Sequence, residues 1–268
     1  MAKIRMVAID MDGTLLNDEL AVSERNRAKI QEAVDRGIYV VLATARTFKA
    51  AQYYAKALNL NMPIITYNGA LVKEAAGGRV ICSSKLDSET AKEIIRFGEE
   101  KGVYTKVYID DVLYVERENE EAREFSRLHR ISYRAVGKLS GNIRQQPYMI
   151  VFKDETEKID FVREKLDQKL NLPVSYTLST PRSLEVMNKG VSKKNALELL
   201  ARRLNIRREE VLAVGNSLND YDMLKWAGVG IAMKNSDRQL LEKWNLVSEY
   251  DNNGDGVSFI LDRYLGLE

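Results

Sequence analysis

The sequence predicts an α/β protein with a doubly wound parallel sheet and a second α/β domain inserted into it. Near both ends of the chain, short apolar segments alternate with amphipathic helical segments, a pattern typical of strand–helix–strand units with parallel strands. Between about residues 84 and 187 a different succession of strands and helices interrupts this pattern. Polar residues directly follow the apolar segments near the two ends, at the sheet edge where such proteins bind ligands.

The first expected strand, Met6–Ile9, runs directly into Asp10, and Asp12 follows two positions later. Alternate residues of an extended chain point to the same side, so the two carboxylates are expected to lie close together. Close, buried carboxylates repel one another, and a cation between them relieves that repulsion. Such oxygen-rich sites suit Mg²⁺ beside phosphate, and an aspartate can also act as a covalent nucleophile. A solvated turn is the alternative, but the apolar segments on both sides favour a site.

The following segments continue the alternation of helices and strands. A helix that begins at Ser23 precedes a strand over residues 38–43, and a helix over 47–58 precedes a strand over 63–66. The strand over 38–43 is almost continuously apolar, as strands of a buried parallel sheet are. These elements complete the first half of the predicted core.

Three polar residues follow these two strands and are expected beside Asp10. Thr44 follows the first strand and Asn68 the second. A threonine hydroxyl and the N–H groups of a loop can hold phosphate oxygens, and the guanidinium of Arg46 suits an anionic substrate. Taken alone, Thr44 is more typical of a local cap, and Asn68 of a turn.

The interrupting segment, residues 84–187, is predicted to be a separate α/β domain. Expected helices over 88–101, 118–128 and 155–170 alternate with expected strands over 104–109, 112–116, 148–153, 173–177 and 183–187. The core domain then consists of residues 1–83 and 188–268. Asp110, Asp111 and Arg182 are hypothetical substrate contacts within the insertion.

After the insertion the core pattern resumes. Expected elements are a helix over 192–204, strands over 211–214, 229–232 and 244–247, and helices over 222–227 and 255–265. Lys193 stands at the start of the first helix, where the helix dipole disfavours a cation. A ligand for its ammonium group is therefore expected, with Lys194 as the adjacent alternative. The strand over 211–214 runs into a second acidic loop, Gly215–Asp220.

Composition excludes several classes of protein. The 268 residues are 45% hydrophobic and 30% charged with a net charge of +2, which is ordinary for a globular protein. We find no basic stripe for nucleic acid, no apolar segment of membrane-spanning length and no signal peptide. The single cysteine, Cys82, permits no internal disulfide and is compatible with a reducing compartment. A cytoplasmic enzyme without nucleic-acid or membrane partners is expected.

The single histidine, His129, limits the available chemistry. A zinc site of histidines and cysteines is disfavoured, and so is a Ser-His-Asp hydrolase unless His129 takes part. Because His129 lies at a charged helix end, we expect it at the surface. Acid–base chemistry is then left to carboxylates or lysine.

These motifs together resemble those of the haloacid dehalogenase-like hydrolases and, among them, the Cof-type phosphatases with a C2B-type cap. Asp10-Met11-Asp12-Gly13-Thr14-Leu15 resembles the first motif of that family, and the segments at Thr44, Asn68, Lys193 and Gly215–Asp220 resemble the others. The resemblance covers nearly the whole chain. It implies a Rossmann-like core, a mobile cap formed by the insertion, and Mg²⁺-dependent hydrolysis of small phosphorylated metabolites, commonly sugar phosphates, through an aspartyl-phosphate.

The resemblance also implies a role for each site residue. Asp10 is the expected nucleophile, and Asp12 the general acid and base. The expected phosphate-binding residues are Thr44, Arg46, Asn68, Lys193 and Asn219. The expected magnesium ligands are Asp10, the backbone carbonyl of Asp12, and Asn216 or Asp220.

Asn216 departs from the family pattern Gly-Asp-x-x-Asn-Asp, in which the first aspartate binds magnesium. An asparagine keeps a carbonyl oxygen but lacks the negative charge, so weaker magnesium binding or a ligand set shifted to Asp220 is expected. One alternative is therefore a weakly active or inactive phosphate-binding homologue. A phosphomutase or phosphotransferase of the same fold, with a similar cap, is another.

Overall fold

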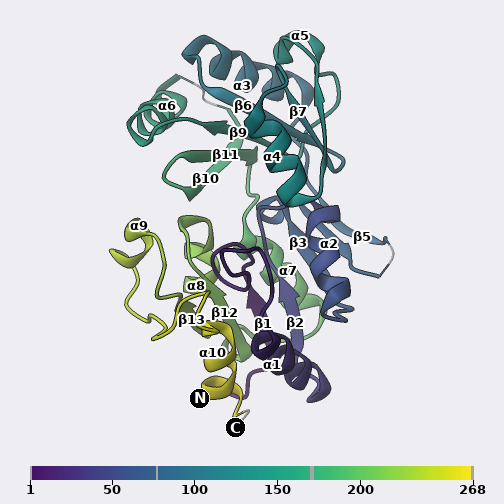
Figure 1. Ribbon diagram of the computed structural model, residues 1–268, viewed down its shortest axis with the longest axis vertical. Helices are drawn as coiled ribbons and strands as arrows, with labels where there is room; N and C mark the ends of the chain where they lie inside the picture. The colour runs from purple at the N-terminus through teal and green to yellow at the C-terminus, as the bar shows by residue number, and fades with distance from the viewer. Residues whose placement is uncertain (1, 77, 170–171, 267–268) are drawn as a thin grey trace.

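The computed structural model describes residues 2–76, 78–169 and 172–266. It has two lobes, and the two ends of the chain lie together at one end of the lower lobe (Figure 1). We call the lower one the core lobe and the upper one, formed by the elements from α3 to β11, the insertion lobe. The centre of the core lobe is a parallel sheet with the strand order β13-β12-β1-β2. These strands are Val229–Ala232, Val211–Gly215, Met6–Ile9 and Tyr39–Leu42.

Helices cover both faces of the parallel sheet, which confirms the predicted α/β class. Val7 and Ile9 of β1 face one way and pack with α1 (Glu24–Asp35), α2 (Phe48–Ala57) and α10 (Gly256–Leu265). Met6 and Ala8 face the other way, toward α7 (Lys193–Arg203) and α8 (Tyr221–Trp226). All four residues of β1 are fully buried, so this strand is held between two apolar layers. No helix in the described part of the chain is long and apolar enough to cross a membrane.

The strand over 63–66 continues the parallel sheet and also begins an antiparallel one. β3 (Pro63–Thr66) joins the parallel sheet beyond β2 through the parallel bridge between Ala43 and Ile65. It pairs antiparallel with β4 (Leu71–Glu74), which pairs with β5 (Val80–Ser83). The cause is a 3₁₀ turn over Tyr67–Gly69 with positive φ at all three residues. A Cβ at Gly69 would clash with the backbone oxygen of Ser192, so this turn packs directly under the start of α7.

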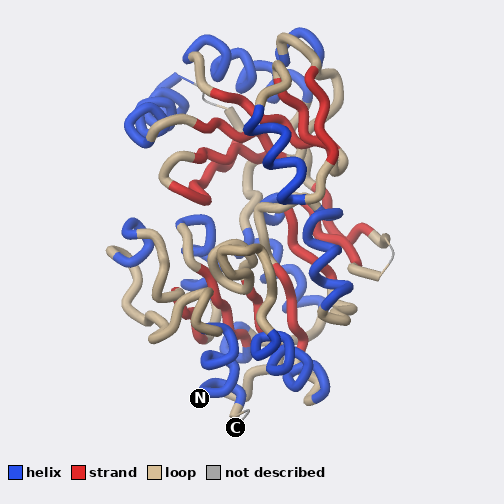
Figure 2. Tube along the Cα trace, viewed as in Figure 1, coloured by secondary structure: helices blue, strands red, loops and turns tan. Residues whose placement is uncertain are grey.

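The insertion lobe contains a six-stranded sheet with the order β10-β11-β9-β6-β7-β8. Its strands are β6 (Tyr104–Ile109), β7 (Val112–Val115), β8 (Ser132–Ala135), β9 (Met149–Lys153), β10 (Val174–Thr180) and β11 (Ser183–Asn188). Its helices are α3 (Ser88–Lys101), α4 (Glu120–His129), α5 (Leu139–Asn142) and α6 (Thr156–Lys169). β8 and α5 were not predicted, and residue 170 of the predicted helix lies outside the described residues. Figure 2 shows the strands of the two lobes as separate groups.

The two faces of the insertion sheet have opposite character. Val107, Ile150 and Val186 point toward α3 and α6, where they form the apolar core of this lobe. Strand residues one position away, including Lys106, Val151 and Glu185, point the other way, toward the core lobe. Because side chains alternate along a strand, this sheet presents a partly charged face to the core.

Two smaller differences concern the C-terminal part. The predicted strand over 244–247 is reduced to one bridge between Ala232 and Val247. The other C-terminal elements follow the prediction, with α9 (Arg238–Leu241) as an additional short helix.

Candidate active site

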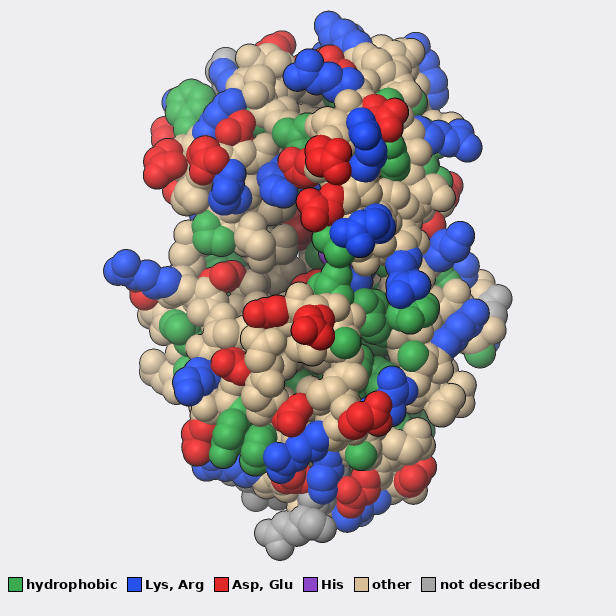
Figure 3. All heavy atoms as spheres, in the orientation of Figure 1, with side chains coloured by type: hydrophobic (Ala, Val, Ile, Leu, Met, Phe, Trp, Pro, Cys, Tyr) green, Lys and Arg blue, Asp and Glu red, His purple; other side chains and the backbone are tan. Residues whose placement is uncertain are grey.

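A cavity of about 290 Å³ lies between the two lobes, where the space-filling view is hollowed (Figure 3). From the core lobe it is lined by Asp10, Asp12, Thr44, Ala45, Arg46, Thr47, Ala50, Asn216, Ser217 and Asn219. From the insertion lobe it is lined by Lys106, Tyr108, Phe125, His129, Ile131, Met149, Val151, Lys153, Ser179, Thr180, Ser183 and Glu185. Six of the nine residues that the sequence predicts as site residues are in the first list; Asn68, Lys193 and Asp220 lie behind that wall.

Parallel pairing brings the strand-end residues together. Asp10 follows β1, Thr44 follows the bridge residue after β2, and Asn216 follows β12. Since β12, β1 and β2 are neighbours in register, their carboxyl ends meet at one edge of the sheet. Thr44 is 1% exposed, and its hydroxyl accepts a 3.1 Å hydrogen bond from the backbone of Arg46.

Lys193 joins Asp10 to Asp220. Its Nζ lies 2.6 Å from Asp10 Oδ1 and 2.7 Å from Asp220 Oδ1. Ser192 caps α7 by accepting from the backbone of Asn195, so Lys193 is the first residue of the helix. Burial alone would lower the pKa of Lys193, but the two carboxylates raise it. The ligand that the sequence predicts for this lysine is therefore a pair of carboxylates.

The surroundings of Asp10 disfavour the ionised form of its carboxyl group. Burial, and then the nearby charge of Asp220, raise its pKa to about 7, although Lys193 acts in the opposite direction. Two carboxylates and one ammonium leave the group with one negative charge in excess. A cation beside Asp10 would lower its pKa by favouring the charged form.

Asp220 is already occupied by other partners. Its second oxygen accepts hydrogen bonds from the backbone N–H groups of Asn216 (2.9 Å) and Ser217 (3.1 Å). The carboxylate is fully buried, and both of its oxygens are engaged. Its observed contacts position Lys193 and the loop after β12.

Asp12 is paired with Arg46. The guanidinium donates two hydrogen bonds, of 2.7 Å and 2.5 Å, to the two carboxylate oxygens. Burial alone would raise the pKa of Asp12, but the hydrogen bonds and the charge of Arg46 hold it below its ordinary value. Asp12 is therefore ionised here, and Arg46, a predicted phosphate ligand, is held by a carboxylate.

Asn68 and Asn219 form part of a connection between the lobes. The Asn219 amide donates a 3.2 Å hydrogen bond to Oδ1 of Asn68, whose own amide donates one of 2.5 Å to Glu185. The other oxygen of Glu185 accepts a 2.6 Å hydrogen bond from the Ser179 hydroxyl. Asn68 thus contacts a carboxylate of the insertion sheet.

The Asn216 side chain faces the oxygens expected to bind magnesium. One terminal atom of its amide lies 3.0 Å from the backbone oxygen of Asp12, 3.2 Å from Asp10 Oδ2 and 3.1 Å from the Thr14 hydroxyl. As nitrogen, this atom donates hydrogen bonds to these acceptors. As oxygen, it completes a set with the spacing of adjacent ligands in an octahedral Mg²⁺ site, about 3 Å for metal–oxygen distances of about 2.1 Å.

The residues present therefore fit a magnesium ion. Asp10, the backbone of Asp12 and the Asn216 carbonyl would hold it. In the described part of the chain, no group of three or more His, Cys, Asp or Glu side chains could hold a metal ion, so this set depends on carbonyl oxygens. A Cβ at Gly13, where φ is +72°, would clash with the Asn216 amide, and glycine keeps that position open.

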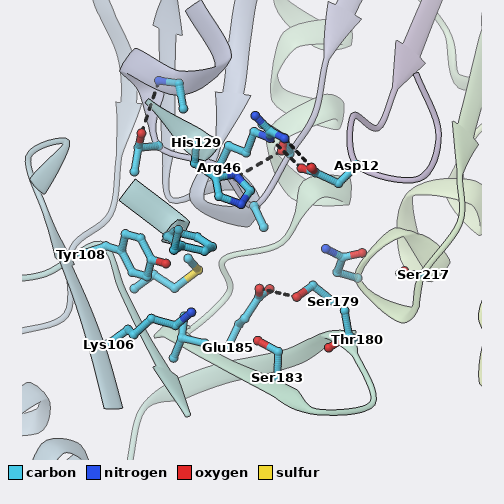
Figure 4. Close-up of a pocket in the computed structure, with 18 of the residues that line it drawn as sticks. Asp12, Arg46, Lys106, Tyr108, His129, Ser179, Thr180, Ser183, Glu185 and Ser217 are labelled. Carbon is cyan, nitrogen blue, oxygen red and sulfur yellow. Dashed lines mark hydrogen bonds and ion pairs between the residues drawn. The ribbon is translucent and has the colours of Figure 1, made fainter. Parts of the chain in front are cut away.

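The structure corrects the expectation for His129. It lies in the cavity wall, not at the open surface, and its ring packs on that of Phe125 at 4.0 Å between centroids. Burial, followed by the charge of Arg46, lowers its pKa to about 4, so the imidazole is neutral at pH 7. Within the described residues its Nδ1 is buried without a hydrogen-bond partner. Figure 4 shows His129 beside Arg46 on one wall.

The insertion-lobe residues that line the cavity were not recognised in the sequence. Asp110 pairs with Lys85, Asp111 accepts from Tyr67, and Arg182 pairs with Glu155, and none of the three lines the cavity. Lys106 and Glu185 of the insertion lobe line the cavity instead. The available signal was strand alternation, because each is a charged residue between two residues whose side chains point to the opposite face of the sheet.

Comparison with known proteins agrees with this geometry. The haloacid dehalogenase-like hydrolase family matches residues 7–261. The chain is 32% identical over 258 residues to the 5-amino-6-(5-phospho-D-ribitylamino)uracil phosphatase YcsE of Bacillus subtilis, with 95% of this chain and 93% of that protein covered.

Two solved structures are also similar to this chain. TM0651 from Thermotoga maritima is 35% identical, with 97% of each chain covered and a TM-score of 0.79. A haloacid dehalogenase-like hydrolase from B. subtilis has a TM-score of 0.87 at 24% identity, covering 97% of this chain and 99% of its own, which supports the fold alone. The chain is therefore a phosphatase of the haloacid dehalogenase-like hydrolase family, as its Cof-type motifs predict.

Proposed function

We propose that this enzyme is a Mg²⁺-dependent phosphatase that hydrolyses small phosphorylated metabolites, among them sugar phosphates, in the cytoplasm through an aspartyl-phosphate on Asp10. The observation that carries the proposal is the contact of Asp10 with Lys193 at the edge of the parallel sheet, next to Asp12 and facing the cavity. The named substrate of YcsE, a phosphorylated ribitylamino compound, supports the class of substrate.

Asp10 supplies the nucleophile. Its carboxylate attacks phosphorus, the bond from phosphorus to the ester oxygen breaks, and Asp12 donates a proton to the departing oxygen. Asp12 then takes a proton from water, which attacks the aspartyl-phosphate and releases inorganic phosphate with the Asp10 carboxylate restored. Lys193 and Thr44 hold phosphoryl oxygens. Bound Mg²⁺ supplies positive charge that stabilises the transferring phosphoryl group.

Arg46 controls the protonation of Asp12 in this proposal. In the pair with Arg46, Asp12 is ionised, which suits the base but not the acid. A substrate phosphate attracts the guanidinium away from Asp12, and the pKa of Asp12 then rises because its cationic partner is gone. Asp12 thereby becomes able to carry the proton that the leaving group needs. The insertion lobe acts as the cap that excludes water during these steps.

The test is hydrolysis of p-nitrophenyl phosphate with and without Mg²⁺. Asp10→Asn is expected to abolish turnover, whereas Asp35→Asn, the same change at an exposed position, retains it. Retained activity in Asp10→Asn would remove Asp10 as the nucleophile. Transfer of phosphate to an added sugar instead of water would identify a phosphotransferase.

A second candidate function, phosphate binding with little turnover, rests on Asn216. Its amide nitrogen can donate hydrogen bonds to Asp10 and the Asp12 carbonyl, so these oxygens have a possible partner other than magnesium. If this candidate is correct, Asn216→Asp raises kcat by orders of magnitude. An unchanged kcat would eliminate it.

A further inference from the structure

The face of the insertion sheet that lines the cavity carries charges at its centre. Lys106 of β6 and Glu185 of β11 are both in register with Val151 of β9, the strand between them. The three side chains therefore form one row across the sheet, and all three line the cavity. Figure 4 shows Lys106 and Glu185 directed into the same space from neighbouring parts of the sheet.

Lys106 is buried, and the ion pair that it forms with a carboxylate is a long one. Its side chain is 5% exposed, and in the described part of the chain its nearest carboxylate, Glu121, is 3.6 Å away, which is long for a hydrogen bond. Glu121 is closer to Lys153, at 2.9 Å. The ammonium also lies 4.2 Å from the ring centroid of Phe125. A buried ammonium in this state has lost its hydrogen bonds to water and has not gained equivalent ones within the protein.

The surrounding charges indicate what Lys106 would bind. Lys106 and Lys153 carry two positive charges, and Glu121 and Glu185 carry two negative ones, so this end of the cavity has no net charge. An additional anion would meet the buried carboxylate of Glu185 in the same space. A neutral oxygen can accept from Lys106 without that repulsion. The neighbouring hydroxyl groups of Ser179, Thr180 and Ser183 also suit a neutral, oxygen-bearing group.

We propose that Lys106 determines specificity for the leaving group, by donating a hydrogen bond to an uncharged hydroxyl or carbonyl oxygen at the end remote from the phosphate. This inference rests on the proposed function, because it concerns the part of the phosphate ester that departs. The apolar side chains of Val151 and Phe125 contact the carbon skeleton. Esters with a second anionic group at the remote end are poor substrates.

The melting temperature of Lys106→Met distinguishes a role in binding from a purely structural role. If Lys106 stabilised the fold, its replacement by the apolar and similarly long methionine would lower the melting temperature. A buried charge kept for binding destabilises the fold, so Lys106→Met should melt at the same temperature as the parent or higher. The sign of the change in melting temperature therefore separates the two roles.

The experiment uses three phosphates of six-carbon chains that differ in their oxygens. Sorbitol 6-phosphate ends in a hydroxyl group, 6-phosphogluconate ends in a carboxylate, and hexyl phosphate has no oxygen beyond the ester. Values of kcat/KM are measured for the parent chain, Lys106→Met, Lys106→Arg and the control Lys138→Met, which removes an exposed lysine of the same lobe. Binding of the same phosphates is measured by calorimetry in the presence of Mg²⁺, with Asp10→Asn added to each variant to prevent turnover.

The parent is expected to prefer sorbitol 6-phosphate to both other esters. Lys106→Met should reduce the preference for sorbitol 6-phosphate over hexyl phosphate by about 10- to 100-fold, the value of a hydrogen bond to a charged group. Lys106→Arg should keep most of that preference, and Lys138→Met all of it. The reduction is expected in KM and in the calorimetric affinity, with kcat changed much less.

Three outcomes overturn the proposal: an unchanged preference in Lys106→Met, a lowered melting temperature or failure of that variant to fold, or a parent preference for 6-phosphogluconate. Absence of hydrolysis of every ester would instead refute the proposed function. The calorimetric preferences would still decide the role of Lys106 in that case, so the two failures are distinguishable.

Discussion

Asn68 of the core lobe donates a 2.5 Å hydrogen bond to the carboxylate of Glu185 in the insertion lobe. Glu185 is 4% exposed, and Ser179 donates to its other oxygen. Asn68 in turn accepts from Asn219, which lines the cavity. The lobes are thus joined beside the proposed catalytic residues by polar side chains that depend on one another for their hydrogen bonds.

Removal of the Glu185 carboxylate is expected to destabilise the protein. Glu185→Ala leaves the Asn68 amide and the Ser179 hydroxyl unpaired in a buried place, at a cost of about 1 to 3 kcal/mol for each group. Glu185→Gln keeps the size of the side chain and one acceptor oxygen for these donors, and should retain more of the stability than Glu185→Ala. Urea unfolding of both variants measures the difference. Equal losses in the two variants would contradict this role.

The stability of the metal-free chain should depend on the ionisation of Asp10. Its pKa of about 7 in the folded state exceeds the ordinary value of 3.8. Protonation therefore favours the folded state: this contribution is complete below about pH 4 and is lost as the pH rises through 7. Asp10→Asn, which stays neutral, should gain stability relative to the parent between pH 5 and pH 8, by about 1 to 4 kcal/mol.

The measurement is thermal unfolding of the parent and Asp10→Asn in the presence of a chelator, at pH 5 and at pH 8. Added Mg²⁺ should reduce the difference at pH 8, because a cation favours the charged form of Asp10. A difference that does not vary with pH would show that Asp10 is not the titrating group.

Asn216→Asp is expected to strengthen magnesium binding. A carboxylate adds a negative charge next to Asp10, and affinity for the cation should rise by about tenfold or more. Without metal the same charge repels Asp10, so the variant should melt at a lower temperature than the parent. Calorimetric titration with Mg²⁺ and melting in a chelator test both expectations. Asn245→Asp, the same change at an exposed position of the core lobe, is the control and should alter neither quantity.

Arg46→Met is expected to shift the basic limb of the kcat/KM profile to higher pH. The guanidinium holds the pKa of Asp12 below its ordinary value, against the effect of burial, so its loss raises that pKa in the free enzyme. The step in which Asp12 donates a proton requires the protonated form. Because kcat/KM follows the protonation state of the free enzyme, activity should persist to higher pH in the variant. The kcat/KM values of the parent and the variant between pH 4 and pH 8 measure the shift. Superimposable basic limbs would show that the pair does not control Asp12.

The KM for sorbitol 6-phosphate should rise above pH 8. Burial, and then the charge of Lys153, lower the pKa of Lys106 to about 8, with Glu121 acting in the opposite direction. Glu185 and the neutral His129 also line its surroundings, and the pKa of His129, about 4, lies well below this range. Loss of the Lys106 proton removes a charged donor, and Lys106→Arg should abolish the rise because arginine stays protonated. A rise that persists in Lys106→Arg would assign it to another group.

Local sequence patterns determined the fold class and the strand ends of the site. Apolar segments of four to six residues separated by helical periodicity predict parallel strands, and the rule that ligands bind beyond their carboxyl ends selects Asp10, Thr44 and Asn68. The first two of these residues line the cavity. The position of the insertion and most of its strands follow from the same periodicities. These features depend on residues that are close together in the sequence, so the sequence pattern is enough to predict them.

Tertiary structure alone decided which partner each charged group has. Asp12 pairs with Arg46, 34 positions away, and Asp10 with Lys193, 183 positions away. The sequence predicts Asn216 or Asp220 as a metal ligand, and the tertiary structure adds that Lys193 and two backbone N–H groups contact Asp220. Lys106, His129 and Glu185 enter the site because the two lobes face one another across the cavity. Hydrogen bonds and charge pairs require a distance of a few ångströms, and distances between remote residues arise only when the sheets and helices pack.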